Sequence, residues 1–227
     1  TMLEWSKEPG LIYIENRKRG YQQVDLYLYD VNSKKQELLY SETSTTNIDN
    51  YNSEVVNEWG KIIITSEKDG WKQLYLLDIK SGKLSAITNG AYYVNSVLHI
   101  DKQTKDILFT ASGKEPGRNP YLLHLYRINI DKKQPVLLTP ENANHDVSVS
   151  PDGKHFADNI STLDLPTRTV LRESASGKII KELSTANIDD LLGMKYRFPE
   201  AFTATGRDGI TTIYGAIWKP SNFDAAK

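Results

Sequence analysis

The stretch Thr65-Ser66-Glu67-Lys68-Asp69-Gly70-Trp71-Lys72-Gln73-Leu74-Tyr75-Leu76-Leu77-Asp78 decides the fold of this chain. A strand runs into a charged turn, and a second strand leaves the turn with the pattern Leu-Tyr-Leu-Leu-Asp. The Asp-Gly pair supplies a glycine where a tight hairpin needs a positive φ angle, and Gly82, Gly153 and Gly177 are expected to do the same in later turns. The stretch therefore predicts a β-hairpin, and the same design returns along the chain.

Four segments repeat this order of strand, turn, strand, turn and outer strand. Aligned on Leu26, Leu74, Leu125 and Thr169, successive copies stand 48, 51 and 44 residues apart. A period of about 40–50 residues is typical of four-stranded propeller blades. We therefore predict an all-β fold, a partial β-propeller of about four four-stranded blades. A β-sandwich with coincidental spacing is the alternative, but turn positions and outer-strand lengths recur together, which favours the repeat.

Each copy is expected to begin with an inner strand and to end with an outer one. We expect inner strands at 2–5, 55–56, 92–97 and 146–150, and outer strands at 36–40, 84–88, 135–139 and 179–183. In the second copy, Trp71 should pack with Leu74 and Leu76 between neighbouring sheets. A ligand-binding loop at residues 66–71 is the alternative, because tryptophan is enriched at recognition surfaces.

The pattern changes after residue 184. A short helix is expected at 186–192, capped by Thr185 or Asn187. A hairpin with strands at 199–204 and 210–218, outside the repeat, should follow. We therefore predict two domains: propeller blades over residues 1–184, and a helix and hairpin over 185–227 that lead into a further domain.

Composition excludes several classes of function. The formal net charge is −1 with 25% charged residues, which does not favour nucleic acid or an anionic membrane as a partner. The basic clusters at 17–19, 34–35 and 132–133 are expected to be solvated hairpin ends. The sequence has no cysteine, hence no disulfide or thiolate metal site, and no apolar run long enough for a spanning helix.

The histidines are scattered and do not predict a metal site. His99, His124, His145 and His155 show no helical i, i+4 spacing with a carboxylate partner. We expect them at the surface or in turns. No cofactor is predicted, and no serine can be nominated as a nucleophile without an adjacent base.

Several motifs resemble those of a known family. Residues 65–75 followed by 87–90, and 116–119 followed by 125–128, resemble the propeller signature of the dipeptidyl peptidase IV family. The pairs 199–200 and 208–209, with 219–224, are similar to the start of a prolyl-oligopeptidase-type hydrolase domain. The resemblance covers nearly the whole chain.

The resemblance implies a periplasmic or extracellular serine exopeptidase that removes N-terminal dipeptides from peptide substrates. In that family an eight-bladed propeller sits over an α/β-hydrolase domain, so this chain would supply the last four blades and the first hydrolase hairpin. Two departures stand out: the sequence has no Gly-x-Ser-x-Gly elbow and no glutamate pair for the substrate amine. The chain alone is therefore expected to be catalytically inert.

The alternative is a stand-alone propeller that binds a protein or ligand and has no peptidase activity. The hairpin after residue 199 argues against it, because such a module has no use for the start of a hydrolase domain. We also expect the open set of blades to self-associate through exposed apolar sheet faces.

The substrate-binding candidates lie in the stretch Thr45–Asn52, which connects an outer strand to the next inner strand. Ile48, Asp49 and Tyr51 are the residues that the resemblance places at the cavity wall, and an ordinary connection between blades is the alternative. A second excursion at 112–120, with Arg118 and Asn119, contains two prolines, and for it a structural role is preferred over contacts with a ligand.

Overall fold

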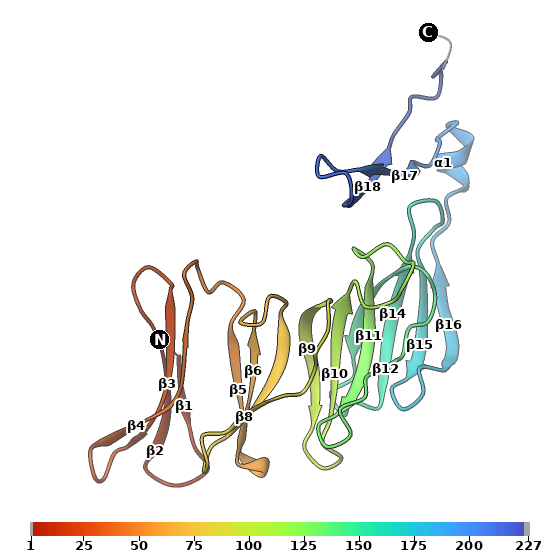
Figure 1. The fold of residues 1–227 in the computed structure, drawn as a ribbon. Helices are drawn as coiled ribbons and strands as arrows, with labels where there is room; N and C mark the ends of the chain where they lie inside the picture. The colour runs from red at the N-terminus through yellow and green to blue at the C-terminus, as the bar shows by residue number, and fades with distance from the viewer. Residues whose placement is uncertain (1, 225–227) are drawn as a thin grey trace. The chain divides into compact units, whose positions relative to one another are not determined.

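The computed structural model describes residues 2–224, and strands dominate it (Figure 1). It contains four four-stranded sheets and one two-stranded sheet. The predicted all-β fold, a partial propeller of four four-stranded blades followed by a hairpin, is thus confirmed. The chain divides into two compact units: Thr1–Lys114 with Ile128–Pro135, and Glu115–Arg127 with Val136–Lys227. The predicted domain boundary at residue 184 stays a prediction.

In every four-stranded sheet the strands are arranged in sequence order, as an antiparallel meander. The first sheet has β1 (Met2–Trp5), β2 (Leu11–Arg17), β3 (Gln23–Asp30) and β4 (Lys35–Thr43). The second has β5 (Asn52–Val56), β6 (Lys61–Ser66), β7 (Gln73–Asp78) and β8 (Leu84–Ala86), with a 3-10 turn η1 (Asn57–Trp59) after β5. The third has β9 (Tyr93–Asp101), β10 (Asp106–Ser112), β11 (Leu123–Asn129) and β12 (Val136–Leu137). The fourth has β13 (Asn144–Val149), β14 (His155–Ser161), β15 (Arg168–Glu173) and β16 (Ile179–Thr185).

After β16 the chain forms helix α1 (Asp189–Gly193) and the hairpin of β17 (Glu200–Thr205) and β18 (Thr212–Ile217). The helix is shorter than expected. The expected cap by Thr185 or Asn187 was wrong, because the N-cap residue is Ile188 and no side chain caps the helix. Asn187, one residue earlier, accepts a hydrogen bond from the Asp189 N–H at 2.8 Å, and Thr185 ends β16 and donates to Glu182. Within the described part of the chain, no helix has the length and apolar character needed to cross a membrane.

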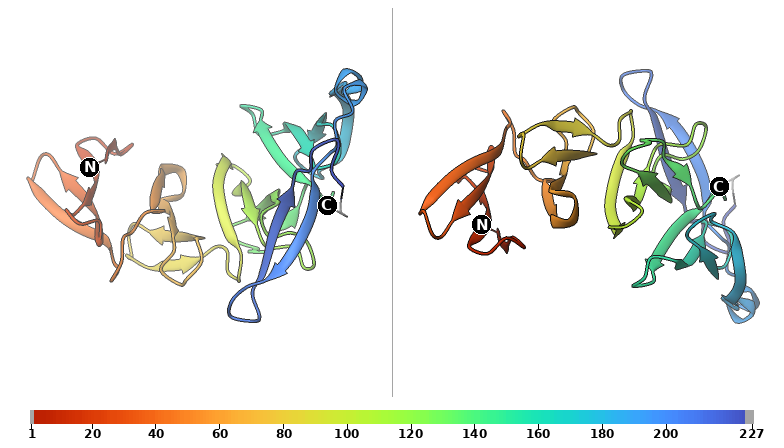
Figure 2. Two further views of the ribbon diagram at one scale, coloured as in Figure 1. Left: turned by 90° about the horizontal axis from the view of Figure 1, so that it is seen from above. Right: turned by 90° about the horizontal axis from the view of Figure 1, so that it is seen from below.

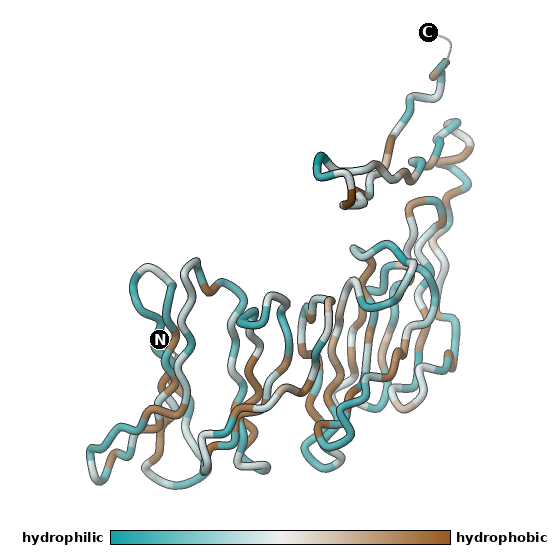
Figure 3. Tube along the Cα trace, in the orientation of Figure 1, coloured by the Kyte–Doolittle hydropathy of each residue, from teal (hydrophilic) through white to brown (hydrophobic). Residues whose placement is uncertain are grey.

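Two strands run longer than expected. Strand β4 runs for nine residues and β9 continues to Asp101, although both were expected to be shorter. The added positions include polar ones such as Ser41 and Asp101, which a strand tolerates because only one of its faces needs to be apolar. The strands of each sheet are visibly twisted (Figure 2), and hydrophobic residues follow the strands while hydrophilic ones gather at the turns (Figure 3).

One buried cluster of the first unit joins the first and second sheets. Strands β6 and β7 are buried along nearly their whole length, as expected for strands covered on both faces. The buried cluster comprises Tyr13, Val24, Leu26, Leu39, Ile48, Tyr51, Val55, Ile62, Ile64, Tyr75 and Leu77. The connection from β4 to β5 therefore contributes to this core together with the strands.

Trp71 does not pack between sheets, so that expectation was wrong. Leu74 and Leu76 are buried, but the Trp71 side chain is 46% exposed. The tryptophan lies in the turn between β6 and β7, beyond the last paired residues Ser66 and Gln73. It therefore lies outside the paired part of the sheet, where strand periodicity does not set the direction of a side chain.

Several turns share one design, an acidic or amide residue followed four positions later by a left-handed residue. Asp78 Oδ1 accepts from the Ser81 N–H, and the Gly82 N–H donates to the Asp78 carbonyl at 2.9 Å. Lys105, with φ 62°, donates in the same way to the Asp101 carbonyl. The glycines predicted to need positive φ, Gly70, Gly82, Gly153 and Gly177, all have it.

Candidate functional site

The three substrate-binding candidates differ in their exposure. Ile48 and Tyr51 are buried, at 7% and 4% exposure, whereas Asp49 is exposed. The Ile48 N–H donates to the Tyr21 carbonyl at 2.7 Å, which fastens the connection to the turn between β2 and β3. Asp49 is thus the member of the set that presents its side chain to solvent. A substrate contact by these residues stays a prediction.

Arg17 and Tyr40 hold Tyr51 in place. The Tyr51 ring is stacked on Tyr40, with centroids 6.4 Å apart and planes inclined by 10°. The Arg17 guanidinium lies 5.9 Å from the Tyr51 ring centroid, and its Nη2 donates to the Tyr51 carbonyl at 2.8 Å. Arg17 was expected in a solvated turn, which was wrong: it ends β2 and pairs with Glu15 at 3.0 Å.

Two buried carboxylates of the first sheet accept hydrogen bonds from serines of the second. Ser53 Oγ donates to Glu15 Oε2 at 2.8 Å, and Ser66 Oγ donates to Glu42 Oε1 at 2.7 Å. Tyr40 Oη donates to Glu42 Oε2 at 2.7 Å. Hydrogen bonds to both oxygens offset the cost of burying each carboxylate. These groups therefore bind the two sheets together.

The Tyr51 hydroxyl is buried and has no hydrogen-bond partner in the part of the chain that the structure describes. The nearby Ser53 hydroxyl donates to Glu15 instead. Burial raises the pKa of Tyr51, and the charges of Glu15 and Glu42 raise it further. The phenol therefore stays neutral and is not an acid–base group near neutral pH.

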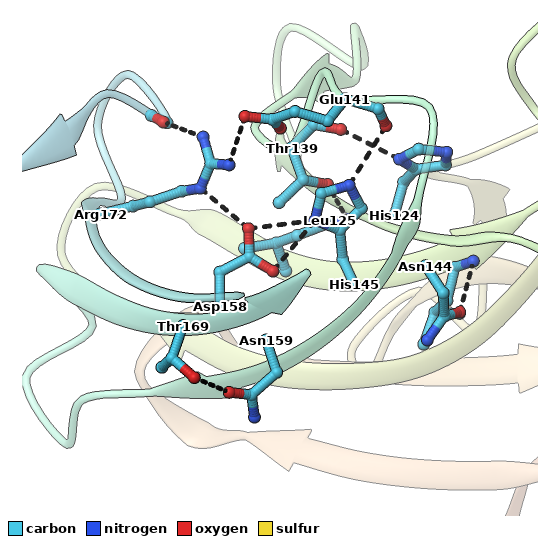
Figure 4. Close-up of polar contacts among 12 residues, drawn as sticks. His124, Leu125, Thr139, Glu141, Asn144, His145, Asp158, Asn159, Thr169 and Arg172 are labelled. Atoms are coloured by element: carbon cyan, nitrogen blue, oxygen red, sulfur yellow. Dashed lines mark hydrogen bonds and ion pairs between the residues drawn. The ribbon is translucent and has the colours of Figure 1, made fainter. Parts of the chain in front are cut away.

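A second polar cluster lies in the second unit, where it is enclosed by the fourth sheet and the segments that precede it (Figure 4). His145 Nδ1 is 3.0 Å from both Oδ1 and Oδ2 of Asp158, and His145 Nε2 is 3.2 Å from the Glu141 carbonyl. Both ring nitrogens thus face oxygen atoms that can accept a hydrogen bond. His145 is therefore fixed in place beside the Asp158 carboxylate.

Arg172 completes this cluster. Its Nε donates to Asp158 at 2.9 Å, its Nη2 to Glu141 Oε1 at 2.7 Å, and its Nη1 to the Gly177 carbonyl at 2.9 Å. The side chains of His145, Asp158 and Arg172 are at most 2% exposed. The Arg172 guanidinium is thus paired with two carboxylates, and such pairing with hydrogen bonds is the condition for burying charge without a large penalty.

His124 lies beside the cluster. Its Nδ1 is 2.9 Å from the Thr139 carbonyl, so Nδ1 carries the proton, and its Nε2 faces Arg118 Nη1 at 3.5 Å. The ring centroids of His124 and His145 are 5.1 Å apart. Burial lowers the pKa of His124, and electrostatic interactions with His145 and Arg118 lower it further. His124 is therefore neutral.

The His145–Asp158 pair has the geometry of a hydrolase dyad but cannot act as one. In such a dyad the second imidazole nitrogen must reach a nucleophile. Here Nε2 is engaged by the Glu141 carbonyl and the ring is fully buried. Among residues 2–224, no group of three or more acidic, histidine or cysteine side chains could hold a metal ion. The cluster therefore has a structural role.

The expectation that His124 and His145 lie at the surface or in turns was wrong. His124 lies in β11 and His145 in β13, and both are buried. One signal was present in the sequence: Phe156, Asp158 and Ile160 alternate on the same face of β14, so a carboxylate takes an inward position between two apolar residues. An inward aspartate requires a cationic partner, and that requirement could have pointed to a buried histidine or arginine.

The excursion before β11 lies near a small pocket in the second unit. Arg118 donates to the Pro140 carbonyl at 2.8 Å and the Glu141 carbonyl at 3.3 Å, in keeping with the structural role preferred for it. Asn119 lines a pocket of about 330 Å³ that Phe202 and Tyr214 of the hairpin also line.

Comparison with known proteins identifies the relatives of this chain. A family model described as the dipeptidyl peptidase IV (DPP IV) N-terminal region matches residues 1–167. Dipeptidyl peptidase 4 of Arthroderma otae is 26% identical over 122 residues, which are 53% of this chain and 15% of the relative. Dipeptidyl peptidase 4 of Trichophyton rubrum has the same identity and coverage. The match thus spans a small part of these relatives.

Two solved structures have a similar fold. A putative dipeptidyl aminopeptidase IV from Bacteroides ovatus covers 100% of this chain and 34% of its own, with a TM-score of 0.79 and 22% identity. Porphyromonas gingivalis dipeptidyl peptidase 4 covers 98% of this chain and 31% of its own, with a TM-score of 0.80 and 18% identity. At these identities the likeness concerns the fold alone.

Proposed function

Because the chain belongs to the dipeptidyl peptidase IV family, within its N-terminal region, we propose that it is the propeller part of a serine exopeptidase that removes N-terminal dipeptides. The observation that carries the proposal is the family match over residues 1–167. The four sheets and the following hairpin agree with it. In this proposal the blades shape the cavity that peptides enter and limit which peptides reach the catalytic residues.

The chain by itself is proposed to be inert. Its 227 residues contain no Gly-x-Ser-x-Gly elbow. The His145–Asp158 pair described above is fully buried. In this proposal, catalysis comes from a hydrolase domain outside this sequence. The hairpin of β17 and β18 supports this arrangement, because its strands expose Phe202, Ile213 and Ile217, which an isolated hairpin cannot bury.

The test compares the purified chain with the full-length protein from the same gene on a Gly-Pro chromogenic substrate. We expect release of the chromophore by the full-length protein and none above the no-protein control by the chain. Cleavage by the chain alone would disprove its inertness. A full-length protein without dipeptidyl peptidase activity would favour the stand-alone binding module.

Asp49 is the proposed peptide contact within this chain, because it is the exposed member of the candidate set. In the full-length enzyme, Asp49→Asn should raise KM by about 3–10-fold and leave kcat unchanged, as expected for loss of a binding contact. Glu37→Gln, an exposed carboxylate on β4, is the matched control and should change neither constant. Equal KM values for wild type and Asp49→Asn would show that Asp49 does not touch the substrate.

We further propose a periplasmic or extracellular location, as the family resemblance implies. Cell fractionation with antibody detection of the full-length protein checks this directly. Recovery in the cytoplasmic fraction alone would contradict the proposal.

A further inference from the structure

The segment of residues 115–122 leads into β11 and is held by two side chains. Arg118 donates from Nη2 to the Pro140 carbonyl at 2.8 Å and from Nη1 to the Glu141 carbonyl at 3.3 Å. Glu115 accepts a hydrogen bond from Tyr126 Oη at 2.9 Å. Arg118 thus ties the segment to the connection between β12 and β13.

The position of the Arg118 side chain, and with it the attachment of residues 115–122, depends on the protonation state of His124. Arg118 Nη1 lies 3.5 Å from His124 Nε2, which can accept from the guanidinium only while it has no proton. The other nitrogen, Nδ1, is committed to the Thr139 carbonyl at 2.9 Å. A second proton on this ring can therefore go only to Nε2, where its N–H would point at the N–H of Arg118.

The charges around His124 oppose that second proton. Arg118 on the segment is positive, and both Arg118 and His145 on β13, whose ring is 5.1 Å away, lower the pKa of His124. On the opposing side, Glu115 is the negative group that faces His124. Asp158, Glu141 and Arg172 lie behind His145, where they pair with it and with one another. A proton on His124 Nε2 would therefore face the guanidinium of Arg118 at close range.

We propose that His124 is an acid-sensitive latch: protonation of its Nε2 repels Arg118 from the Pro140 and Glu141 carbonyls and frees residues 115–122. The consequence reaches the pocket of about 330 Å³, because Asn119 lines it. Tyr121, which is exposed, meets the Tyr214 ring edge-on with centroids 6.4 Å apart. Release of Arg118 would free both residues and loosen this side of the pocket.

Hydrogen exchange measured by mass spectrometry on the intact protein tests the latch. Protection of the 115–122 peptide should fall by about tenfold between pH 7.5 and pH 4.5 after correction for intrinsic exchange, while the β15 peptide keeps its protection. The Arg118 N–H donates to the Glu115 carbonyl and the Leu122 N–H to the Asn119 carbonyl, so amides inside the segment report its opening. Constant protection of the segment over this range would overturn the proposal.

Variants separate the latch from a general effect of acid. His124→Asn keeps a donor for the Thr139 carbonyl but cannot titrate, so the segment should stay protected at acid pH. Arg118→Ala should leave it unprotected at both pH values. His155→Asn is the matched control, because His155 is exposed and should leave the wild-type response intact. A full acid response in folded His124→Asn would overturn the proposal.

A measurement on the wild type keeps the test independent of variant folding. The ¹⁵N shift of the His124 imidazole should titrate over the same pH interval as the protection of residues 115–122. Separate midpoints would show that the loosening has another cause and would also overturn the proposal.

Discussion

The rings of Tyr40 and Tyr51 are stacked with their planes 10° apart, yet only the Tyr40 hydroxyl has a hydrogen-bond partner among the described residues. Tyr40 Oη donates to the Glu42 carboxylate at 2.7 Å, whereas Tyr51 Oη is buried without an acceptor. Replacing each tyrosine by phenylalanine therefore removes a hydroxyl group from two different environments, one with a hydrogen bond and one without.

Tyr51→Phe is therefore expected to leave the free energy of unfolding unchanged or to raise it by about 1 kcal/mol, because it removes an unsatisfied buried donor. Tyr40→Phe should lower it by about 1–3 kcal/mol, because a hydrogen bond to a charged group is lost. Urea unfolding followed by tryptophan fluorescence gives both values. A destabilised Tyr51→Phe variant would mean that an acceptor for this hydroxyl exists.

Gly177 and Gly82 form a second matched pair. Both have positive φ, +74° and +67°, but a Cβ at Gly177 would overlap the Leu138 carbonyl oxygen, whereas nothing lies within 4 Å of one at Gly82. Gly82→Ala should cost about 1–2 kcal/mol of stability from backbone strain alone. Gly177→Ala should cost about 1–3 kcal/mol more from the clash with the Leu138 carbonyl. The clash also displaces the Gly177 carbonyl, which accepts a hydrogen bond from Arg172. Thermal unfolding of both variants checks the order, and equal losses would contradict it.

Lys34 has a left-handed backbone, with φ 58°, in the turn between β3 and β4. Glycine adopts this conformation without the steric penalty of a Cβ. Lys34→Gly should therefore raise stability by up to about 1 kcal/mol, since the relief exceeds the extra entropy of the unfolded chain. Lys35→Gly removes the same charge from the first residue of β4 and should lower stability. The denaturant midpoints of the two variants should therefore move in opposite directions. A shift of both in the same direction would show that backbone strain at Lys34 does not determine the effect.

The depressed pKa of His124 makes stability depend on pH. Its ordinary value is 6.5, and the folded protein holds it lower, so below pH 6.5 the unfolded chain binds a proton that the folded chain does not. The contribution of neutral His124 is therefore complete above pH 6.5 and is lost as pH falls through the folded pKa. His124→Asn should lose less stability than wild type between about pH 7.5 and pH 5 in urea titrations. Parallel losses in the two proteins would exclude His124 as a source of acid sensitivity.

Self-association of the chain is expected from apolar side chains that its sheets expose. Leu3 and Trp5 of β1 are about two-thirds exposed, and β16, at the edge of its sheet, exposes Ile180 and Leu183. Apolar patches and free strand edges favour association. Light scattering at micromolar concentration should therefore give a mass above that of the monomer, and Ile180→Lys should reduce it. Lys181→Ser is the control on the same strand, and a clean wild-type monomer would contradict the prediction.

Much of the fold could be predicted from local patterns, because turns and alternation are properties of neighbouring residues. The Asp69-Gly70 hairpin and the Ser81-Gly82 turn are present with the expected positive φ angles. The hairpin after residue 199 pairs Glu200 with Ile217 and Thr205 with Thr212. These features depend on glycine geometry and on a two-residue side-chain period, which the chain carries wherever it folds.

The candidate sites were harder to predict, because they depend on which face of a strand is covered. Ile48, Asp49 and Tyr51 lie within four consecutive residues, yet one is exposed and two are in the core. No hydrophobic period governs a connection between sheets, so its side chains take their directions from the surfaces they meet. The exposure of Trp71 has a similar cause, because this residue lies in a turn beyond the paired strands, where no strand period sets the direction of its side chain.

The sequence by itself determined the repeat, the strand order within each sheet and the family, since these rest on spacing and on short motifs. Only the tertiary structure brought His145, Asp158 and Arg172 into one buried cluster and made His124 neutral beside it. The partners lie 13 and 14 residues apart on different strands. Strand register decides whether they meet, because a shift of one residue turns each side chain to the opposite face.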